Sequence, residues 1–406
     1  MERTVWTRYL IWLSATLLAA LAACGAFNLF IDPLGIFGSP RIGGINAFKP
    51  YLDHHRELAR WKGAQRLCPN AGIFGNSRAE IGFDPEHPDF AANGHRGFNH
   101  AVPGTSVATA VNQLEWLRQA GCAPKTIVLG VEFIDFVGSP SPPPVVSALP
   151  PAPAINAAVL AESVFSVTGI RDSLETLLIQ HSRYPASLTE KGFNPLLNYV
   201  PEVTHSGHYA LFRQRATENA SKWLRMSAQV QPNSGKSNEF VQLERFLDAA
   251  SQEADTIHVV IYPYHAQLRL LMNKVGFEDL FTQWKSGVVS AAHRERKSAT
   301  RVTVWDFSGI SAQTLEPIPE PGDRRTRLKY YWEGGHFKRE LGDLMLSQML
   351  GGKPGFGMAL TPETLPAWLD RDQGQVREQL QSNVALRLDV ESVLDQVRAK
   401  NAASGR

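Results

Sequence analysis

Short apolar segments alternate with helical stretches along most of this chain, and this alternation constrains the fold more than any other feature. Short, continuously apolar segments are typical of parallel strands that are covered on both faces. The predicted strands are residues 71–74, 97–99, 126–133, 256–262 and 301–307, and the main predicted helices between and around them are 52–67, 107–119, 238–254, 267–289 and 337–350. We therefore expect an α/β fold: a three-layer α/β/α sandwich with about five parallel strands, flavodoxin-like in outline.

The N-terminus carries a long apolar segment. Arg3 and Arg8 precede an apolar run, residues 9–31, and roughly 20 apolar residues suffice for a helix to cross a bilayer. A cleaved signal peptide usually has a shorter apolar core. Because arginines on the short N-terminal side favour the cytoplasm, we expect a single-pass N-terminal transmembrane helix with the rest of the chain outside.

Cys24 leaves an alternative open at this segment. The sequence Leu-Ala-Ala-Cys at residues 21–24 resembles a bacterial lipobox, after which Cys24 would become a lipidated N-terminus. The apolar run continues through residues 25–31, whereas a lipoprotein usually turns polar after its cysteine. We expect an uncleaved anchor and keep the lipoprotein as the alternative.

The other two cysteines, Cys68 and Cys122, precede two predicted strands at the same spacing. Each lies five residues before the first isoleucine of its strand, Ile73 or Ile127. If these strands are parallel neighbours, both cysteines lie at the same end of the sheet. An oxidising compartment would then allow a disulfide, and two buried free thiols are the alternative.

The predicted elements divide the chain into four parts. These are a membrane anchor at 1–31, a connector with the first helix at 32–67, the α/β domain at 68–350 and a polar helical tail at 351–406. Within the α/β domain, the helical insertion 138–236 contains no predicted strand and opens with the proline run 139–144, which favours a stiff exposed loop. It leaves the sheet after the carboxyl end of a strand, where it would form a lid or substrate wall, or a passive addition.

The composition argues against several functional classes. The net charge of +2, from 41 basic and 39 acidic residues, gives no electrostatic signature of nucleic-acid binding. The sequence contains no Cys-x-x-Cys pair and no Gly-x-x-x-x-Gly-Lys-Ser/Thr loop, which common zinc modules and phosphate loops require. His205 and His208 lack acid partners at a useful spacing. We expect no nucleic-acid partner, no metal and no organic cofactor.

A serine follows the first predicted strand on a tight turn. The sequence Ile-Phe-Gly-Asn-Ser-Arg at 73–78 presents Ser77 directly after this strand. A nucleophilic serine needs such a turn, because its Oγ must face a cleft beside N–H groups that stabilise an oxyanion. Gly-Asn-Ser is also common turn chemistry. Arg78 would either bind a substrate carboxylate or pair with an acid such as Glu80.

The loop after the second predicted strand offers two candidate oxyanion donors. Gly104 lacks a Cβ and can bring its N–H close to a bound oxyanion. Asn99 can donate an amide hydrogen bond or order the loop. The alternative is a helix-entry loop in which Gly104 only permits a turn.

A histidine with an acid three residues before it lies near the end of the predicted α/β domain. In the sequence Glu-Gly-Gly-His at 333–336, the two glycines let the loop fold back on itself. His336 would act as general base for Ser77, and Glu333 would orient the ring and stabilise the imidazolium. The alternative is an exposed loop whose histidine caps the next helix.

Two further residues follow the carboxyl ends of predicted strands. His265 comes after the fourth strand, where it would contact substrate or lie in a surface loop. Asp306 ends the fifth strand and is an alternative orienting acid for His336.

These motifs together resemble the SGNH/GDSL hydrolase superfamily, which has a serine in a Gly-Asp-Ser-like block, a glycine and an asparagine in later blocks, and Asp-x-x-His in the last. The Asp-Pro connector at 32–33 and the Ser-Arg turn at 77–78 are similar to a membrane-anchored branch that includes proteins linked to bacterial exopolysaccharide O-acetylation. The resemblance covers about residues 28–350.

The resemblance implies a role for each motif residue. Ser77 would be the nucleophile, His336 the base and Glu333 the acid, with the N–H groups of Ser77 and Gly104 as oxyanion donors. Three residues depart from the family pattern: Asn76 and Glu333 each replace an aspartate, and Glu132 occupies the position of the Gly-x-Asn-Asp asparagine. Glu132 is also a candidate substrate-binding residue. A carboxylate cannot donate to an oxyanion unless it is protonated.

We therefore expect a serine esterase or O-acetyltransferase in the bacterial inner membrane, with its catalytic domain in the periplasm. Its substrate would be a carbohydrate, in particular a cell-surface or secreted polysaccharide, and a membrane partner would supply the acyl group. The first alternative is a catalytically inactive scaffold that binds glycan or belongs to a cell-envelope assembly. The second is a lipid-directed esterase with the insertion as a lid.

Overall fold

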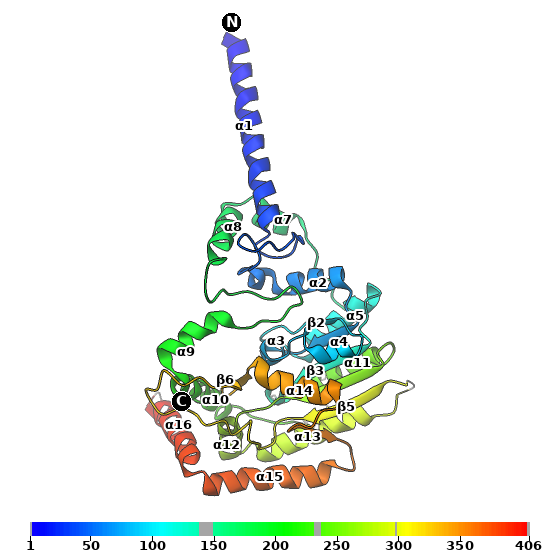
Figure 1. Cartoon of the computed structure of the whole chain (residues 1–406), viewed down its shortest axis with the longest axis vertical. Coiled ribbons are helices and arrows are strands. Elements are labelled where there is room, and N and C mark those ends of the chain that lie inside the picture. The colour runs from blue at the N-terminus through cyan, green and yellow to red at the C-terminus, as the bar shows by residue number, and fades with distance from the viewer. Residues whose placement is uncertain (1, 138–148, 231–236, 297–298, 404–406) are drawn as a thin grey trace. The chain divides into compact units, whose positions relative to one another are not determined.

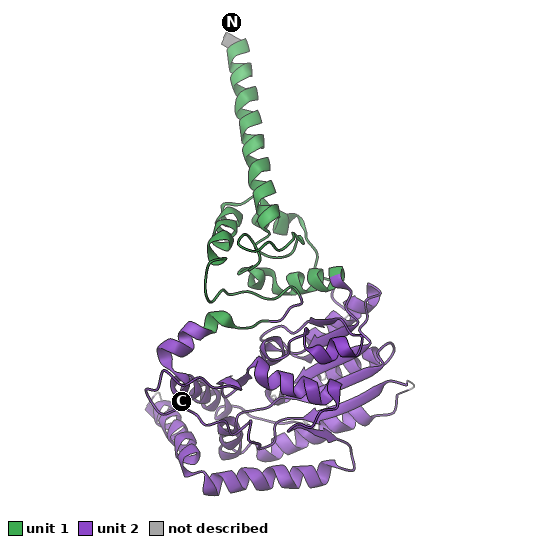
Figure 2. Cartoon of the chain, viewed as in Figure 1, with its two compact units in different colours: residues 1–66, 152–190, 194–199 green, residues 67–151, 191–193, 200–406 purple. Residues whose placement is uncertain are grey.

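The computed structural model describes residues 2–137, 149–230, 237–296 and 299–403. The chain forms two compact units (Figure 2). Unit 1 comprises residues 1–66, 152–190 and 194–199, and unit 2 comprises residues 67–151, 191–193 and 200–406. The predicted insertion is thus shared between the units, and its proline run 139–144 lies outside the described residues.

Unit 2 is built on a six-stranded, mostly parallel sheet (Figure 1). Its strands are β1 (Ala71–Phe74), β2 (Gly97–Asn99), β3 (Thr126–Val131), β4 (Thr256–Ile261), β5 (Arg301–Asp306) and β8 (Met358–Leu360). They run in the order β2-β1-β3-β4-β5-β8, with the first five parallel and β8 antiparallel to β5. The expected α/β class with five parallel strands is confirmed. In this doubly wound order, ligands bind beyond the carboxyl ends of the strands at the switch point between β1 and β3.

Helices cover both faces of this sheet. On one face, Ile73, Val128 and Val260 share a buried cluster with Leu341 and Met345 of α14 (Arg339–Gly351). On the other, Phe74 packs edge-on against Phe246 of α11 (Asn238–Ala250), with ring centroids 5.4 Å apart. The other helices of unit 2 are α3 (Ser77–Gly82), α4 (Pro88–Ala92), α5 (Val107–Gln119), α6 (Phe133–Phe136), α9 (Val200–Ser206), α10 (His208–Trp223), α12 (Ala266–Lys274), α13 (Glu278–His293), α15 (Leu365–Ser382) and α16 (Val384–Ala403). Because both faces are buried, β1 and β3 are buried at every position and read as continuous apolar runs.

Two predicted helical features differ from the structure. The stretch 267–289 is not one helix, because Gly276 adopts φ +83° and separates α12 from α13. The C-terminal segment is part of unit 2: β8 joins the sheet, and α15 and α16 pack against α12. A buried network fixes α15, in which Asp372 accepts hydrogen bonds from Arg269 at 3.1 Å and Lys285 at 2.7 Å.

Unit 1 contains the N-terminal helix and part of the insertion. Its elements are α1 (Glu2–Ile31), the 3-10 helices η1 (Leu52–His55) and η2 (Leu197–Tyr199), most of α2 (Arg56–Leu67), α7 (Ala157–Val164) and α8 (Val167–Ile179). Within α1, the segment Thr4–Ile31 is long and apolar enough to cross a membrane. The end of α1 is closed by Lys49, whose Nζ donates to the carbonyls of Ile31 at 3.0 Å and Asp32 at 2.8 Å.

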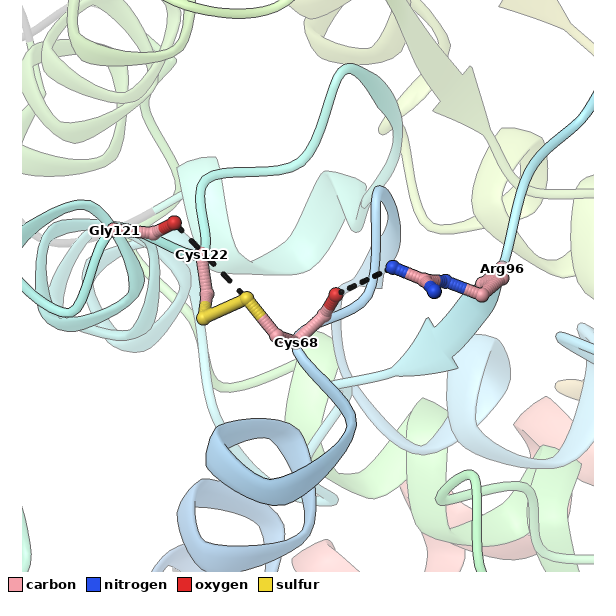
Figure 3. The surroundings of a disulfide bond; sticks show 4 residues. All are labelled: Cys68, Arg96, Gly121 and Cys122. Carbon is pink, nitrogen blue, oxygen red and sulfur yellow. Dashed lines mark hydrogen bonds between the residues drawn. A yellow bond between two sulfur atoms is a disulfide. The ribbon is translucent and has the colours of Figure 1, made fainter.

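A disulfide joins Cys68 and Cys122 (Figure 3). The strands that follow them, β1 and β3, are parallel neighbours, so the spacing in the sequence brings both cysteines to the same end of the sheet. The carbonyl of Cys68 also accepts a hydrogen bond from Arg96 at 3.4 Å, which links the bridge to the segment that enters β2.

Candidate active site

The turn after β1 presents Ser77 as the first residue of α3. Gly75 adopts φ +144°, and a Cβ there would lie 2.5 Å from the Tyr262 hydroxyl, so the position requires glycine. Asn76 caps α3, its side-chain oxygen accepting the backbone N–H of Arg78 at 3.1 Å. A short polar residue is favoured at this position, which explains why Asn serves here as well as Asp.

The histidine and its acid lie on a two-stranded hairpin. Strand β6 (Tyr331–Glu333) pairs with β7 (His336–Phe337), and Glu333 is directly opposite His336 in the register. The Gly-Gly connection is therefore a two-residue hairpin loop, which brings the two side chains to the same place. The acid-x-x-His spacing follows from this geometry.

A continuous chain of side-chain hydrogen bonds joins Ser77, His336 and Glu333. Ser77 Oγ lies 2.8 Å from His336 Nε2, and His336 Nδ1 contacts Glu333 Oε1. With Nδ1–H donating to the carboxylate, Nε2 is free to accept the serine proton. Neither Ser77 nor His336 is fully buried, so the pair is partly exposed at the surface of unit 2.

Glu333 is held in its charged form. Burial alone would raise the pKa of this carboxyl, but the neighbouring His336, the charge of Arg215 and the N–H of Gly335 outweigh it and lower the pKa to about 2. The Gly335 N–H donates to Glu333 Oε2 at 2.7 Å. A fixed negative charge at this position stabilises an imidazolium on the adjacent ring.

Helix α10 supports the hairpin with two residues that the sequence did not single out for this role. Arg215 Nε lies 3.3 Å from Glu333 Oε1. The buried His208 accepts the N–H of Leu328 at 3.2 Å and donates from Nδ1 to the carbonyl of Trp332 at 3.1 Å. Burial lowers the pKa of His208 to about 4, so it is neutral at physiological pH. No sequence signal connects α10 to a hairpin more than a hundred residues downstream.

Arg78 and Glu132 are partners of each other. Arg78 Nη1 forms an ion pair with Glu132 Oε2, and its Nε donates to the carbonyl of Gly335 at 2.6 Å. Tyr264 donates to the other carboxylate oxygen of Glu132 at 2.9 Å. Arg78 thus ties the serine turn to both β3 and the histidine hairpin. Of the two predicted roles, the structure shows pairing with an acid, which is Glu132.

Asn99 orders the backbone at the end of α3. Its amide donates to the carbonyls of Ala79 and Phe83, each at 2.8 Å, and its side-chain oxygen accepts the N–H of Ala101 at 3.0 Å. The amide is therefore engaged at the end of α3, which matches the second role predicted for it, ordering the loop. Gly104 adopts φ +72° and lies in the same loop, which contacts the serine turn where the N–H of Val102 donates to the carbonyl of Gly75 at 3.0 Å.

His265 and Asp306 have structural roles. His265 is buried and caps α12, with Nδ1 accepting the N–H of Gln267 at 3.1 Å and Nε2 donating to the carbonyl of Glu316 at 2.8 Å. Burial lowers its pKa to about 4. It borders a cavity of about 510 Å³ that neither Ser77 nor His336 lines. Asp306 pairs with Lys285 at 2.7 Å, and the acid on His336 is Glu333. The substrate contact expected of His265 stays a prediction.

No family model, curated protein or solved structure matches this chain.

Proposed function

We propose that this chain is a membrane-anchored serine enzyme of the SGNH type, an esterase or O-acyltransferase acting on a carbohydrate. The observation that carries the proposal is the 2.8 Å contact between Ser77 Oγ and His336 Nε2, with a charged Glu333 on the other ring nitrogen. A serine, a histidine and an acid in this order constitute the machinery of acyl transfer on several unrelated folds.

The proposed reaction proceeds through an acyl-serine. His336 Nε2 takes the proton from Ser77 Oγ as Oγ attacks the ester carbonyl. The oxyanion of the tetrahedral intermediate accepts hydrogen bonds from the backbone N–H groups of Ser77 and Gly104. When the intermediate collapses, His336 returns the proton to the leaving alcohol. Water or a sugar hydroxyl then attacks the acyl-serine by the same steps in reverse.

The rest of the molecule supports an extracytoplasmic location for this chemistry. Helix α1 would anchor the chain, and the Cys68–Cys122 bridge favours an oxidising compartment such as the periplasm. The parallel sheet with helices on both faces is compatible with a three-layer SGNH-like sandwich. The acyl donor, which we take to be an acetyl donor, would come from a membrane partner, and the acceptor would be a polysaccharide.

The test is to trap the intermediate. The full chain in detergent micelles is incubated with p-nitrophenyl acetate, quenched with acid and digested, and the peptide containing Ser77 is analysed by mass spectrometry. We expect an acetylated peptide in the wild type and in Ser106→Ala, and none in Ser77→Ala. Acetylation on other residues only, or none in folded wild type, would contradict the proposal.

One observation favours a second candidate, a glycan-binding scaffold without activity. Glu132 occupies the asparagine position of the family, and its carboxylate is paired with Arg78. The Asn99 amide is also engaged, so neither of these two side chains supplies a donor to the oxyanion. In the scaffold, the trapping experiment would give no acetyl-serine while glycan binding persisted in Ser77→Ala.

A further inference from the structure

Three large apolar residues of helix α8 lie on its exposed side. Val167, Leu174 and Leu178 are 83%, 50% and 75% exposed. Their spacing of seven and four residues puts them along one face of the helix. A stripe of this kind on a protein surface marks an interaction site and not an ordinary water-facing surface.

The opposite face of α8 is polar and buried. Asp172, Ser173 and Thr176 are 4%, 0% and 0% exposed. A helix that covers a core in water turns its apolar face inward and its polar face outward. In α8 the buried face is polar instead, and the exposed Arg171 and Glu175 lie beside the apolar stripe. An exposed apolar stripe bordered by charged side chains is the pattern of a helix at a membrane interface.

The buried face of α8 packs on α1 by the contacts that hold helices together in membranes. Ser173 Oγ donates to Asn28 Oδ1 at 2.8 Å, and Asn28 Nδ2 donates to the carbonyl of Val164 at 2.9 Å. Small residues allow the close approach: a Cβ on Gly25 would lie 2.9 Å from the ring of Phe165. Interhelical hydrogen bonds from polar side chains and small residues at the contact are characteristic of helix packing in lipid.

These contacts fix where the α7–α8 connection lies along α1. Gly25 and Asn28 precede the last residue of α1 by six and three positions, or about 9 and 4.5 Å at 1.5 Å per residue. Beside this level the outer surface of α1 is still apolar, with Leu29 and Phe30 41% and 50% exposed. The exposed Phe165 therefore continues the lipid-facing surface of α1.

We propose that the α7–α8 tip, defined as Phe165 and Val167, lies in the interfacial layer of the same bilayer that α1 crosses. Interfacial helices present an apolar face to the boundary between headgroups and acyl chains. Unit 1 would then have two attachments to the membrane, the span and the tip. The inference rests on α1 as the anchor but not on the chemistry of Ser77.

The test measures the depth of a fluorophore in the full chain, reconstituted in vesicles of phosphatidylcholine and phosphatidylglycerol. In a Cys24→Ala background, NBD is attached at Val167→Cys, with Leu18→Cys in the span and His181→Cys as references. His181 follows α8 directly after Gln180, whose amide donates to the carbonyl of Phe48 at 2.8 Å, beyond the end of α1. Quenching by doxyl-labelled lipid and by aqueous iodide is compared at the three sites.

We expect the Val167 label to be quenched by doxyl lipid and protected from iodide, as at Leu18, with the opposite result at His181. If the Leu18 label is quenched by lipid while the Val167 label behaves like that at His181, the anchor stands and the tip proposal is wrong. A Val167 label shielded from both quenchers only at high protein-to-lipid ratio would assign this surface to a second copy and would equally overturn the proposal.

Discussion

The Arg78–Glu132 pair links the three segments that form the site. The Arg78 side chain is 15% exposed and that of Glu132 is 5% exposed, so each charge depends on its partner. Glu132 therefore has a physical reason to be present where the resembled family has an amide: it neutralises the arginine that follows the serine. Glu132 departs from the family pattern, yet through Arg78 it contributes to the position of Ser77.

Glu132→Gln should consequently destabilise unit 2. Removing one partner of a buried ion pair leaves an uncompensated charge, and we expect the free energy of unfolding to fall by about 3 kcal/mol. The control is Glu86→Gln, which breaks an exposed pair with Lys191 and should cost less than about 1 kcal/mol. Urea unfolding measures both, and equal losses would refute this role of Glu132.

Glu333 should make stability depend on pH in a defined window. Its pKa is lowered from 4.5 to about 2, so the folded state binds this proton less readily than the unfolded state does. The stabilisation is fully present above pH 4.5 and is lost as the pH falls towards 2. We expect the difference in unfolding free energy between wild type and Glu333→Gln to shrink from pH 5 to pH 3. A difference that grows in this window would contradict the assigned charge state.

At the scale of elements, the hairpin β6–β7 and helices α3, α10 and α14 hold the reacting groups together. The positions of the hairpin and of the turn into α3 could be predicted from the sequence. The acid-Gly-Gly-His run is a local signal for the hairpin, and a glycine turn after an apolar strand is one for α3. The contribution of α10 could not be predicted, since Arg215 reads as an ordinary surface residue of an amphipathic helix. Asn99 was ambiguous for a similar reason: its sequence position suits both an oxyanion donor and the backbone contacts it makes.

Arg215 should be a positioning residue for the acid. Loss of its charge weakens the hold on Glu333, and we expect Arg215→Gln to slow acylation of Ser77 about tenfold, equivalent to roughly 1.4 kcal/mol. Arg215→Lys, which retains the charge, should recover part of the rate. The matched control is Arg213→Gln on the same helix, whose partner is Asp389 at 3.1 Å; it should leave the rate within about twofold. Equal rates for Arg215→Gln and wild type would exclude the role.

A close approach of α14 to α3 supports the serine helix. A Cβ on Gly342 would lie 1.7 Å from the carbonyl oxygen of Gly82, so Gly342→Ala should force the helices apart and cost about 2 kcal/mol or more. Gly374 in α15 meets nothing within 4 Å, and Gly374→Ala should stabilise by up to about 1 kcal/mol. Thermal unfolding of the two variants should shift in opposite directions, and shifts of the same sign would contradict the packing argument.

On the scale of the whole molecule, the positions of the parallel strands could be predicted better than the division of the chain into units. A buried parallel strand can be recognised in the sequence by its apolar run. The packing of a polar helix on a distant surface leaves no such local pattern. Thus the predicted tail belongs to unit 2 because Asp372 joins the buried Arg269 and Lys285, and the predicted insertion supplies α7 and α8 to unit 1 and α10 to the site. Asp306, at the end of β5, illustrates the same limit, since its partner Lys285 lies on helix α13.

The central claim is that Ser77 is an activated nucleophile, and labelling with a fluorophosphonate probe tests it most directly. The full chain in detergent micelles is compared with Ser77→Ala, His336→Ala and the control Ser106→Ala, whose serine donates to Glu239 and contacts no histidine among the described residues. The account predicts labelling of the wild type and of Ser106→Ala, and none of Ser77→Ala or His336→Ala. Folded wild-type protein that does not react, or labelling that persists in Ser77→Ala, would contradict it.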